Sequence, residues 1–393
     1  MAEQQKVAIV AGARTPVGRF GGAFRDTEAY ELGAAAATEA LRRSGIAPDR
    51  VGEVVLGTIG QVASDAYIAR RVALAAGLDV NTPAFTVNRL CGSGLQAIWS
   101  GAQELLWGST DVVVAGGAEN MTRMPFYDFD SRFNDRLGDR RLLDGTIAML
   151  TDPFSGRHMG VTAENVAERF GITRQEQDAF AAESQRRAAT AESQRAFAEE
   201  IVAVTTSGRR SVEVTTDEHP RPDTTVESLA GLRSAFVTDG TVTAGNASGI
   251  NDGAAATVLM READARAEGA PVLATIEAVT TAALEPEIMG YAPTLALKKL
   301  FAQTGIGPDE VSTVELNEAF ASQVLAVVRD AGLDPAKTNP YGGAIALGHP
   351  VGATGAILTV RAALTLQRTG GEYAIVTMCI GGGQALAALL KRG

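Results

Sequence analysis

A repeated segment constrains the fold of this chain more than any other feature. The fourteen residues Ser44–Gly57 align without gaps on Thr304–Asn317, and seven of the fourteen positions are identical. Each copy follows a stretch of good helix formers and ends in an apolar run that is typical of a β-strand. Asp111–Gly117 and Tyr373–Cys379 form a second pair, because both are buried-type strands that run into glycines. The sequence therefore predicts two similar α/β halves.

The start of the chain indicates how one half is built. Val7–Val10 reads as a strand, Ala29–Ser44 as a helix that ends before Gly45, and Val51–Leu56 as a second strand. A strand, a helix and a strand with short joints between them are typical of a βαβ unit. We therefore expect a parallel sheet.

Between the halves, from about residue 119 to residue 244, the chain is polar, charged and rich in arginine. It contains one clear helix, which begins with a capping box at Thr173 and Glu176 and continues to about Glu200. The region is too long for a structureless loop and indicates an inserted subdomain. The apolar run Val242–Met260 then resumes the first half. The predicted units are an N-terminal half of residues 1–118 and 245–272, an insertion of 119–244, and a C-terminal half of 273–393.

Charge and hydropathy exclude several classes of partner. The chain carries 35 Lys and Arg against 46 Asp and Glu, a net charge of −11 that repels nucleic acid and anionic membrane surfaces. The first residues lack the basic and apolar segments of a signal peptide. No run of about 18 apolar residues predicts a transmembrane helix. We expect a cytoplasmic protein without nucleic-acid or membrane partners.

Few residues are available for nucleophilic chemistry or proton transfer, since the chain has only two cysteines and three histidines. Two cysteines are too few for a thiolate zinc site, and no H-x-x-x-H pattern is present, so we expect no metal. The chain has no P-loop. The turn after the first strand lacks the G-x-G-x-x-G pattern of a dinucleotide-binding fold.

Cys91 lies at a predicted junction between a strand and a helix, in Asn88-Arg-Leu-Cys91-Gly-Ser-Gly94. The first amides of a helix stabilise a thiolate and lower the pKa of a thiol, which would prepare Cys91 as a nucleophile. The segment alone is equally compatible with an inert buried thiol.

Two further segments bring polar groups together with glycines. His349 lies in Tyr341–Gly355, which holds five glycines, and Pro350 restricts it to extended geometry. Cys379 ends an apolar strand and is followed by Gly381–Gly383, whose amides can form an oxyanion hole. A histidine in a turn and a core cysteine remain the structural alternatives.

Asn317 and His158 are weaker candidates. Asn317 ends the strand of the second repeat, where an asparagine can donate to an oxyanion or simply cap a helix. His158 precedes a predicted helix in the insertion and by itself is more typical of a structural or exposed residue. His219 has no assigned role.

Taken together, five motifs resemble the thiolase family over the whole chain, in particular its biosynthetic acetyl-CoA acetyltransferases and β-ketothiolases. They are Asn88–Gly94, Gly245-Asn-Ala-Ser248-Gly, Asn317-Glu-Ala-Phe320, Gly348–Gly355 and Cys379-Ile-Gly381-Gly-Gly. The resemblance implies two duplicated βαβαβαββ halves in a five-layered α-β-α-β-α arrangement, with a loop domain inserted in the first half. It implies an acyltransferase of lipid and fatty acid metabolism. Its reaction is the reversible condensation of two acetyl-CoA to acetoacetyl-CoA and CoA, or thiolysis of a 3-ketoacyl-CoA.

The resemblance also implies roles for individual residues. Cys91 would be the nucleophile that forms an acyl-enzyme, and His349 the base that activates it. Cys379 would exchange the α-proton of the second substrate. Asn317, through a held water and alongside His349, would stabilise the enolate, and the amides of Cys91 and Gly381 would stabilise the tetrahedral intermediate.

The same resemblance places the insertion over coenzyme A, which is a substrate and not a tightly bound cofactor. His158 and Met159 would line the pantetheine and acyl region, Ser248 would contact the pantetheine, and Arg221 would lie near the adenine nucleotide. A homotetramer, with a dimer as the simpler alternative, would assemble through the loop near Met121–Asp139.

Three alternatives can be weighed on the same residues. A β-ketoacyl synthase commonly uses one Cys with two His, or with His and Asn, so the late Cys379 motif favours a thiolase. A noncatalytic acyl-CoA-binding or lipid-binding relative predicts a substituted Cys91, His349 or Cys379, and all three are present. A nicotinamide oxidoreductase is disfavoured because its glycine fingerprint is missing.

Overall fold

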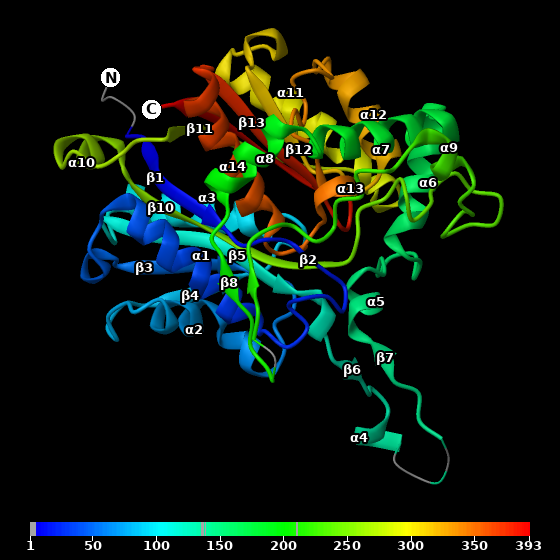
Figure 1. The fold of residues 1–393 in the computed structure, drawn as a ribbon, viewed down its shortest axis with the longest axis horizontal. Helices are drawn as coiled ribbons and strands as arrows, with labels where there is room; N and C mark the ends of the chain where they lie inside the picture. The colour runs from blue at the N-terminus through cyan, green and yellow to red at the C-terminus, as the bar shows by residue number, and fades with distance from the viewer. Residues whose placement is uncertain (1–4, 135–136, 138, 210) are drawn as a thin grey trace.

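The computed structural model describes residues 5–134, 137, 139–209 and 211–393 (Figure 1). Its centre is a mixed ten-stranded sheet with the order β12-β13-β14-β11-β1-β10-β5-β3-β4, and β2 pairs with β10. The strands of this sheet are β1 (Val7–Arg14), β2 (Gly18–Arg19), β3 (Glu53–Gly57), β4 (Ala84–Val87), β5 (Val112–Asn120), β10 (Asn251–Arg261), β11 (Ala274–Ala283), β12 (Thr313–Leu316), β13 (Tyr373–Ile380) and β14 (Gln384–Arg392).

The two halves of the sheet repeat one topology, which confirms the prediction of two similar α/β halves. In the first, β3 is parallel to β5, and β5, β10 and β1 follow in antiparallel order; β12, β13, β14 and β11 repeat this order in the second. The halves join where Val7 of β1 pairs with Ile276 of β11. The partner strand β4 is reduced in the second half to one parallel bridge, between Val314 and Thr338.

The expectation of a parallel sheet is wrong for β1. Within the described residues, parallel pairing is limited to β3 with β4 and β5, and to β12 with β13, apart from isolated bridges. β10, which follows the insertion, lies between β1 and β5 and pairs antiparallel with both. A strand that returns from so far along the chain leaves no local pattern near β1, so the βαβ reading could not anticipate it.

Helices cover both outer faces of the sheet and fill the space between its halves (Figure 1). α1 and α2 pack on the outer face of the first half, and α11 and α12 on that of the second. α3 and α14 share one apolar core with the inner faces of both. These layers are the expected α-β-α-β-α arrangement. The helices outside the insertion are α1 (Ala29–Ser44), α2 (Ile68–Ala75), α3 (Ser93–Trp107), α10 (Glu262–Ala267), α11 (Ala292–Thr304), α12 (Ala321–Ala331), α13 (Ala344–Leu347) and α14 (Thr354–Thr369), together with short 3₁₀ helices at Pro48–Arg50, Ala63–Tyr67, Met121–Arg123, Pro286–Tyr291 and Pro308–Glu310.

Two glycines set the distance between the central helices. A Cβ atom on Gly94 of α3 would lie 2.7 Å from the backbone nitrogen of Ala356, and one on Gly355 of α14 would lie 2.4 Å from that of Leu95. The first turns of α3 and α14 are therefore in backbone contact, which a larger residue at either glycine would prevent. This contact brings together the segments that precede the two helices, and these segments carry Cys91 and His349.

The insertion consists of short elements around longer helices. They are β6 (Phe126–Tyr127), α4 (Ser131–Asn134), β7 (Leu143–Asp144), α5 (Gly145–Met149), α6 (Met159–Phe170), α7 (Arg174–Ala188), α8 (Ala191–Glu200), β8 (Val204–Thr205), β9 (Glu213–Val214) and α9 (Val226–Ala230). The prediction of one helix to Glu200 is wrong, although its capping box at Thr173 is present. Thr190 starts a second helix, because its side chain accepts a hydrogen bond from the backbone of Ser193.

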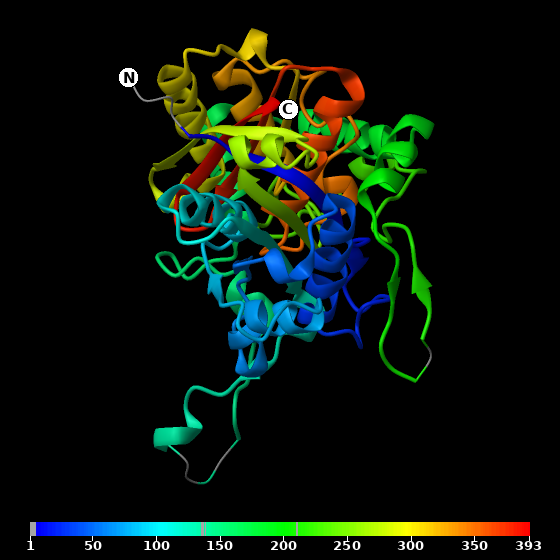
Figure 2. The ribbon, with the colours of Figure 1, turned by 90° about the vertical axis from the view of Figure 1, so that its left-hand side faces the viewer.

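Two parts of the insertion extend from the body of the molecule (Figure 2). One is the arm formed by β6, α4 and β7, and the other is the hairpin of β8 and β9. The base of the hairpin is attached to β1 by buried ion pairs from Arg14 to Glu200 and to Asp217, each 2.7 Å long. No helix in the described ranges combines the length and apolar character needed to cross a membrane.

Candidate active site

Cys91 lies in a tight turn between β4 and α3. The turn is closed by hydrogen bonds from the backbone of Gly92 to Arg89 and of Ser93 to Leu90, and Leu90 adopts a positive φ of 47°. A Cβ atom on Gly92 would lie 2.5 Å from Cδ1 of Ile380, the residue after Cys379. The turn therefore packs directly on the end of β13.

The electrostatic prediction for Cys91 is wrong in direction for the free protein. Burial raises the pKa of its thiol to about 11, although the amides of Gly381 and of Cys91 itself hydrogen-bond the sulfur and lower the pKa. The charge of Glu119 raises it a little further. Loss of hydration outweighs the helix N-terminus here, so Cys91 is a neutral thiol near pH 7 and needs a base.

His349 is held as a neutral base with one defined tautomer. Its Nδ1 lies 2.7 Å from the hydroxyl of Thr354, which donates its only hydrogen to the carbonyl of Pro350 at 2.9 Å. With the hydroxyl so engaged and the amide nitrogen of Asn317 facing Nε2, the ring hydrogen is assigned to Nδ1 and Nε2 keeps its lone pair. The side-chain amide nitrogen of Asn317 lies 3.4 Å from Nε2. Burial lowers the pKa of His349 to about 4, so the ring is uncharged near pH 7.

The second thiol and a second set of donors lie beside this pair. Burial, and next the charge of Cys91, raise the pKa of Cys379 well above its usual range, so the two thiols lie within electrostatic reach of each other. The side-chain oxygen of Asn317 is buried and has no hydrogen-bond partner in the part of the chain that the structure describes. The structure thus brings Cys91, His349, Cys379, Asn317 and Gly381 into one site.

Three of the four residues predicted to bind coenzyme A border the same site. Met159 lies against Gly381, since a Cβ atom on this glycine would be 3.1 Å from the methyl group of Met159. His158 caps α6 by accepting the backbone hydrogen of Gly160 on Nδ1. The backbone of Ser248 donates to the carbonyl of Ala319, next to the Asn317 segment. Arg221 is exposed on the insertion.

Family comparisons agree with this geometry. The model of the thiolase N-terminal domain matches residues 7–263, and that of the thiolase C-terminal domain matches residues 270–392. The chain belongs to the thiolase family. This confirms the resemblance, and the fold agrees with solved thiolases.

Curated relatives and solved structures match this chain over nearly its whole length. A β-ketothiolase of Cupriavidus necator is 48% identical over 99% of each chain, and an acetyl-CoA acetyltransferase of Pseudomonas aeruginosa is 46% identical over 99% of this chain and 100% of its own. The crystal structure of the Bacillus anthracis acetyl-CoA acetyltransferase matches with a TM-score of 0.97 at 41% identity, over 99% of each chain. Human mitochondrial 3-ketoacyl-CoA thiolase in complex with CoA matches with a TM-score of 0.95 at 40% identity, over 99% of this chain and 98% of its own.

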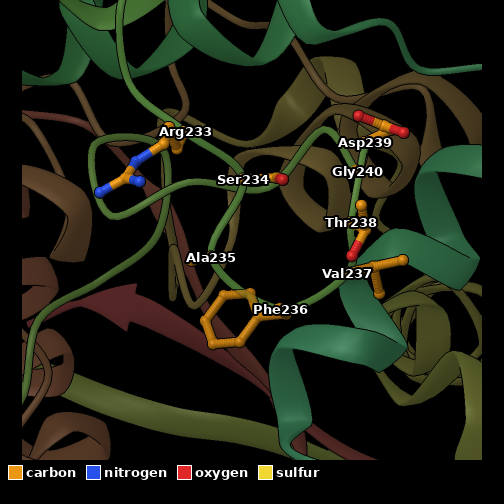
Figure 3. Close-up of a pocket in the computed structure, with 8 residues that line it drawn as sticks. All are labelled: Arg233, Ser234, Ala235, Phe236, Val237, Thr238, Asp239 and Gly240. Atoms are coloured by element: carbon orange, nitrogen blue, oxygen red, sulfur yellow. The ribbon is translucent and has the colours of Figure 1, made fainter.

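A cavity of about 590 Å³ is lined by residues 233–240 of the insertion (Figure 3). Within this segment, Phe236 stacks on His158 with ring centroids 4.7 Å apart, and meets Phe320 edge-on at 6.1 Å. The sequence reasoning missed Phe236, because a single aromatic residue in a polar segment has no periodic pattern. Phe236 lines the cavity and contacts Phe320, so it connects the cavity to the Asn317–Phe320 motif.

Sequence reasoning also missed two residues that hold the segment of His349. Asn251 of β10 accepts the backbone hydrogen of His349 at 2.9 Å. Glu119 of β5 accepts that of Gly352 at 3.0 Å, and burial raises its pKa to about 7. A charged residue at the end of the apolar run Val112–Asn120 was the only available signal. No group of three His, Cys, Asp or Glu side chains in the described residues could hold a metal ion.

Proposed function

We propose that this thiolase is an acetyl-CoA C-acetyltransferase that works by a ping-pong mechanism through an acyl group on Cys91. The reaction is the reversible Claisen condensation of two acetyl-CoA to acetoacetyl-CoA and CoA. One observation carries the proposal: a neutral His349 whose Nε2 carries no hydrogen lies in one site with the thiol of Cys91 and the buried thiol of Cys379. The names of the bacterial relatives, an acetyl-CoA acetyltransferase and a β-ketothiolase, support the substrate class.

In the first half-reaction, the sulfur of Cys91 attacks the carbonyl carbon of an acyl-CoA while Nε2 of His349 takes the thiol proton. The carbonyl oxygen gains negative charge and accepts hydrogen bonds from the amides of Cys91 and Gly381. The carbon–sulfur bond to CoA then breaks, and His349 returns its proton to the leaving CoA thiolate. The acyl group remains on Cys91 and the coenzyme is released before the second substrate binds.

In the second half-reaction, Cys379 first passes its thiol proton to the neutral His349, and its sulfur then removes an α-proton from acetyl-CoA. The resulting enolate attacks the acyl carbon, and the sulfur of Cys91 leaves as a thiolate that takes the proton back from His349. Acylation prepares this step, because an acylated Cys91 can no longer ionise beside Cys379, while burial keeps the pKa of Cys379 high. A thiolate with a high pKa is a strong base, which a C–H bond requires. The amide of Asn317 and His349 stabilise the enolate oxygen.

Coenzyme A enters as a substrate under this proposal, and no tightly bound cofactor is required. The pantetheine would lie along Phe236, His158, Met159 and Ser248, with the nucleotide near Arg221. Support comes from the stacking of Phe236 on His158 and from the CoA complex of the human relative. Residues 119–244 would act as the CoA-binding loop domain between the halves 1–118 with 245–272 and 273–393.

The predicted homotetramer has support in the arm of the insertion. Its large side chains Phe126, Phe129 and Phe133 are exposed by 63%, 69% and 83%, which is costly for a surface without a partner. Asp135, Arg136 and Gly138 of the predicted Met121–Asp139 contact lie outside the described residues. The cytoplasmic location and the place in lipid metabolism remain predictions from the sequence.

The test is CoA-dependent cleavage of acetoacetyl-CoA and of 3-ketohexanoyl-CoA by the wild type and by Cys91→Ala. We expect the wild type to cleave acetoacetyl-CoA and the folded variant, checked by its melting curve, to lose the activity. A wild type inactive on both substrates would rule out the function. Equal rates for both proteins would rule out the mechanism, and the ratio between the substrates assigns the chain-length class.

A further inference from the structure

A short segment of the insertion, Asp217–His219, is held against the first half of the thiolase by hydrogen bonds. Its Asp217 carboxylate accepts two hydrogen bonds from Arg14, at 2.7 and 3.0 Å, and one from the backbone of Val17 at 2.8 Å. The carboxylate of Glu218 accepts the backbone hydrogen of Ala23 at 3.0 Å. These contacts fix the backbone on which His219 stands.

His219 touches Asn251, whose side-chain amide has only one possible orientation. The oxygen of this amide accepts the backbone hydrogen of His349 at 2.9 Å, and its nitrogen donates to the carbonyl of Gly18 at 2.9 Å. The same nitrogen lies 3.3 Å from Nδ1 of His219. Because the amide nitrogen can only donate, Nδ1 of His219 must accept, and the ring hydrogen must lie on Nε2.

The other contact of the His219 ring is with the segment that carries His349. The ring hydrogen-bonds the backbone of Ile345, and this bond raises the pKa of His219, although burial and Arg221 lower it overall. A bond that favours the protonated ring is a donation to a carbonyl group. His219 therefore bridges Asn251, next to the backbone of His349, and Ile345, four residues before it.

A glycine makes room for this bridge. A Cβ atom on Gly249 would lie 2.3 Å from Cε1 of His219 and 2.8 Å from the side-chain oxygen of Asn251. The next residue, Ile250, forms a parallel bridge with His349. The close packing of Gly249, His219 and Asn251 against the backbone of His349 therefore depends on the absence of a side chain at position 249.

We propose that His219 is a positioning residue of the thiolase reaction: through Asn251 it holds the backbone of His349, so that Nε2 of His349 is aimed at Cys91. The inference rests on the function proposed above. Without an acceptor at Nδ1, one hydrogen of the buried Asn251 amide loses its partner, and only the bonds to His349 and Gly18 still hold the amide. Because catalysis depends on placement within fractions of an ångström, a shift of this amide lowers the rate of the chemical step.

The experiment compares His219→Asn with His219→Leu in acetoacetyl-CoA thiolysis. Asparagine offers an oxygen near the place of Nδ1 and should keep kcat within about threefold of the wild type, whereas leucine offers none and should lower kcat by about tenfold. KM for acetoacetyl-CoA should stay within about twofold in both. A change confined to KM would show that His219 only supports the CoA-binding insertion, and equal kcat values for the two variants would overturn the proposal.

Gly249→Ala tests the same contact from the other side, with His219 unchanged. The added methyl group must displace the ring or the Asn251 amide, so kcat should fall as in His219→Leu even if the leucine variant does not fold. Wild-type kcat in a folded Gly249→Ala protein would refute the inference. An inactive wild type would instead refute the proposed function, so the two failures are distinguishable.

Discussion

Removal of one hydroxyl group should test the tautomer of His349 without touching its ring. In Thr354→Val, the methyl group that replaces the hydroxyl fills the same volume but accepts no hydrogen bond. In the wild type, Nδ1 of His349 lies 2.7 Å from the Thr354 hydroxyl oxygen, whose own hydrogen is donated to Pro350. In the variant, the hydrogen on Nδ1 would lose this buried acceptor. The competing tautomer, with its hydrogen on Nε2, cannot take a proton from Cys91 and faces the amide hydrogens of Asn317.

The expected size of the effect follows from the burial of His349. An unpartnered buried donor costs about 1–3 kcal/mol, and this penalty falls only on the tautomer that can act as the base. If the whole penalty is expressed in catalysis, it corresponds to a loss of roughly 5- to 150-fold in kcat for acetoacetyl-CoA thiolysis. The rate at which acetyl-CoA acylates Cys91, followed by intact-protein mass spectrometry, should fall by the same factor, because this step needs the base directly.

Two variants separate this effect from a general weakening of helix α14. Thr354→Ser keeps a hydroxyl and should retain most of the activity. Thr359→Val removes another fully buried hydroxyl of α14, which donates to the carbonyl of Gly355 one turn earlier at 2.7 Å. Thr359 is ten residues from His349 in the sequence. This variant should lose stability and keep kcat. If Thr354→Val is as active as Thr359→Val, or Thr354→Ser as impaired as Thr354→Val, the tautomer assignment is wrong.

Three further predictions follow from the buried titratable groups. Because the pKa of His349 is lowered to about 4 and its neutral form is the base, kcat/KM should stay constant as the pH falls from about 7 to 5.5, and a break near pH 6.5 would contradict this. Cys379→Ser should still form an acyl-enzyme on Cys91 but lose condensation, as measured by acylation in mass spectrometry and by acetoacetyl-CoA formation; failure to acylate would refute this division of roles. Burial raises the pKa of Glu315 to about 8, so the folded state keeps a proton that the unfolded state releases, and stability falls as the pH rises from about 4.5 to 8. Glu315→Gln should therefore gain in melting temperature relative to the wild type between about pH 6 and pH 8.5, whereas parallel curves would argue against a buried proton on Glu315.

Much of the fold could be predicted because its signals are local. The helix over Ala29–Ser44 was predicted with its observed ends, since Gly45 adopts the left-handed conformation that ends helices. The repeat Ser44–Gly57 indicated the duplicated halves because each copy codes for its own helix, turn and strand. The place of β10 was beyond this reasoning, since pairing across more than a hundred residues depends on the whole sheet. The break at Thr190 was missed because Ala-rich segments on both sides have the same composition.

The reactive residues of the candidate site lie in motifs that the chain itself displays, while the groups that orient them do not. Cys91 and Cys379 are conspicuous because cysteine is so scarce in this chain. Glu119 and Asn251 each accept one backbone hydrogen bond from the His349 segment, which lies far from them in the sequence. Thr354 contacts the His349 ring from five residues later in the chain. Only coordinates reveal such partners. The direction of the pKa shift of Cys91 was wrong for a related reason: a helix N-terminus is visible in the sequence, but the degree of burial is not.

The neutral state of the free site has a consequence for the order of the reaction. A thiol of raised pKa and an imidazole of lowered pKa favour the uncharged pair, so Cys91 gives up its proton as it attacks and not before. The charge of Cys91 ranks only second to burial among the causes that raise the pKa of Cys379, so Cys379 is also an uncharged thiol in the free site. Acylation converts Cys91 into a thioester that cannot ionise, while the burial of Cys379 remains. Cys379 must therefore also pass its proton to a neutral base of the site during the second half-reaction, so that neither thiol is a thiolate between turnovers.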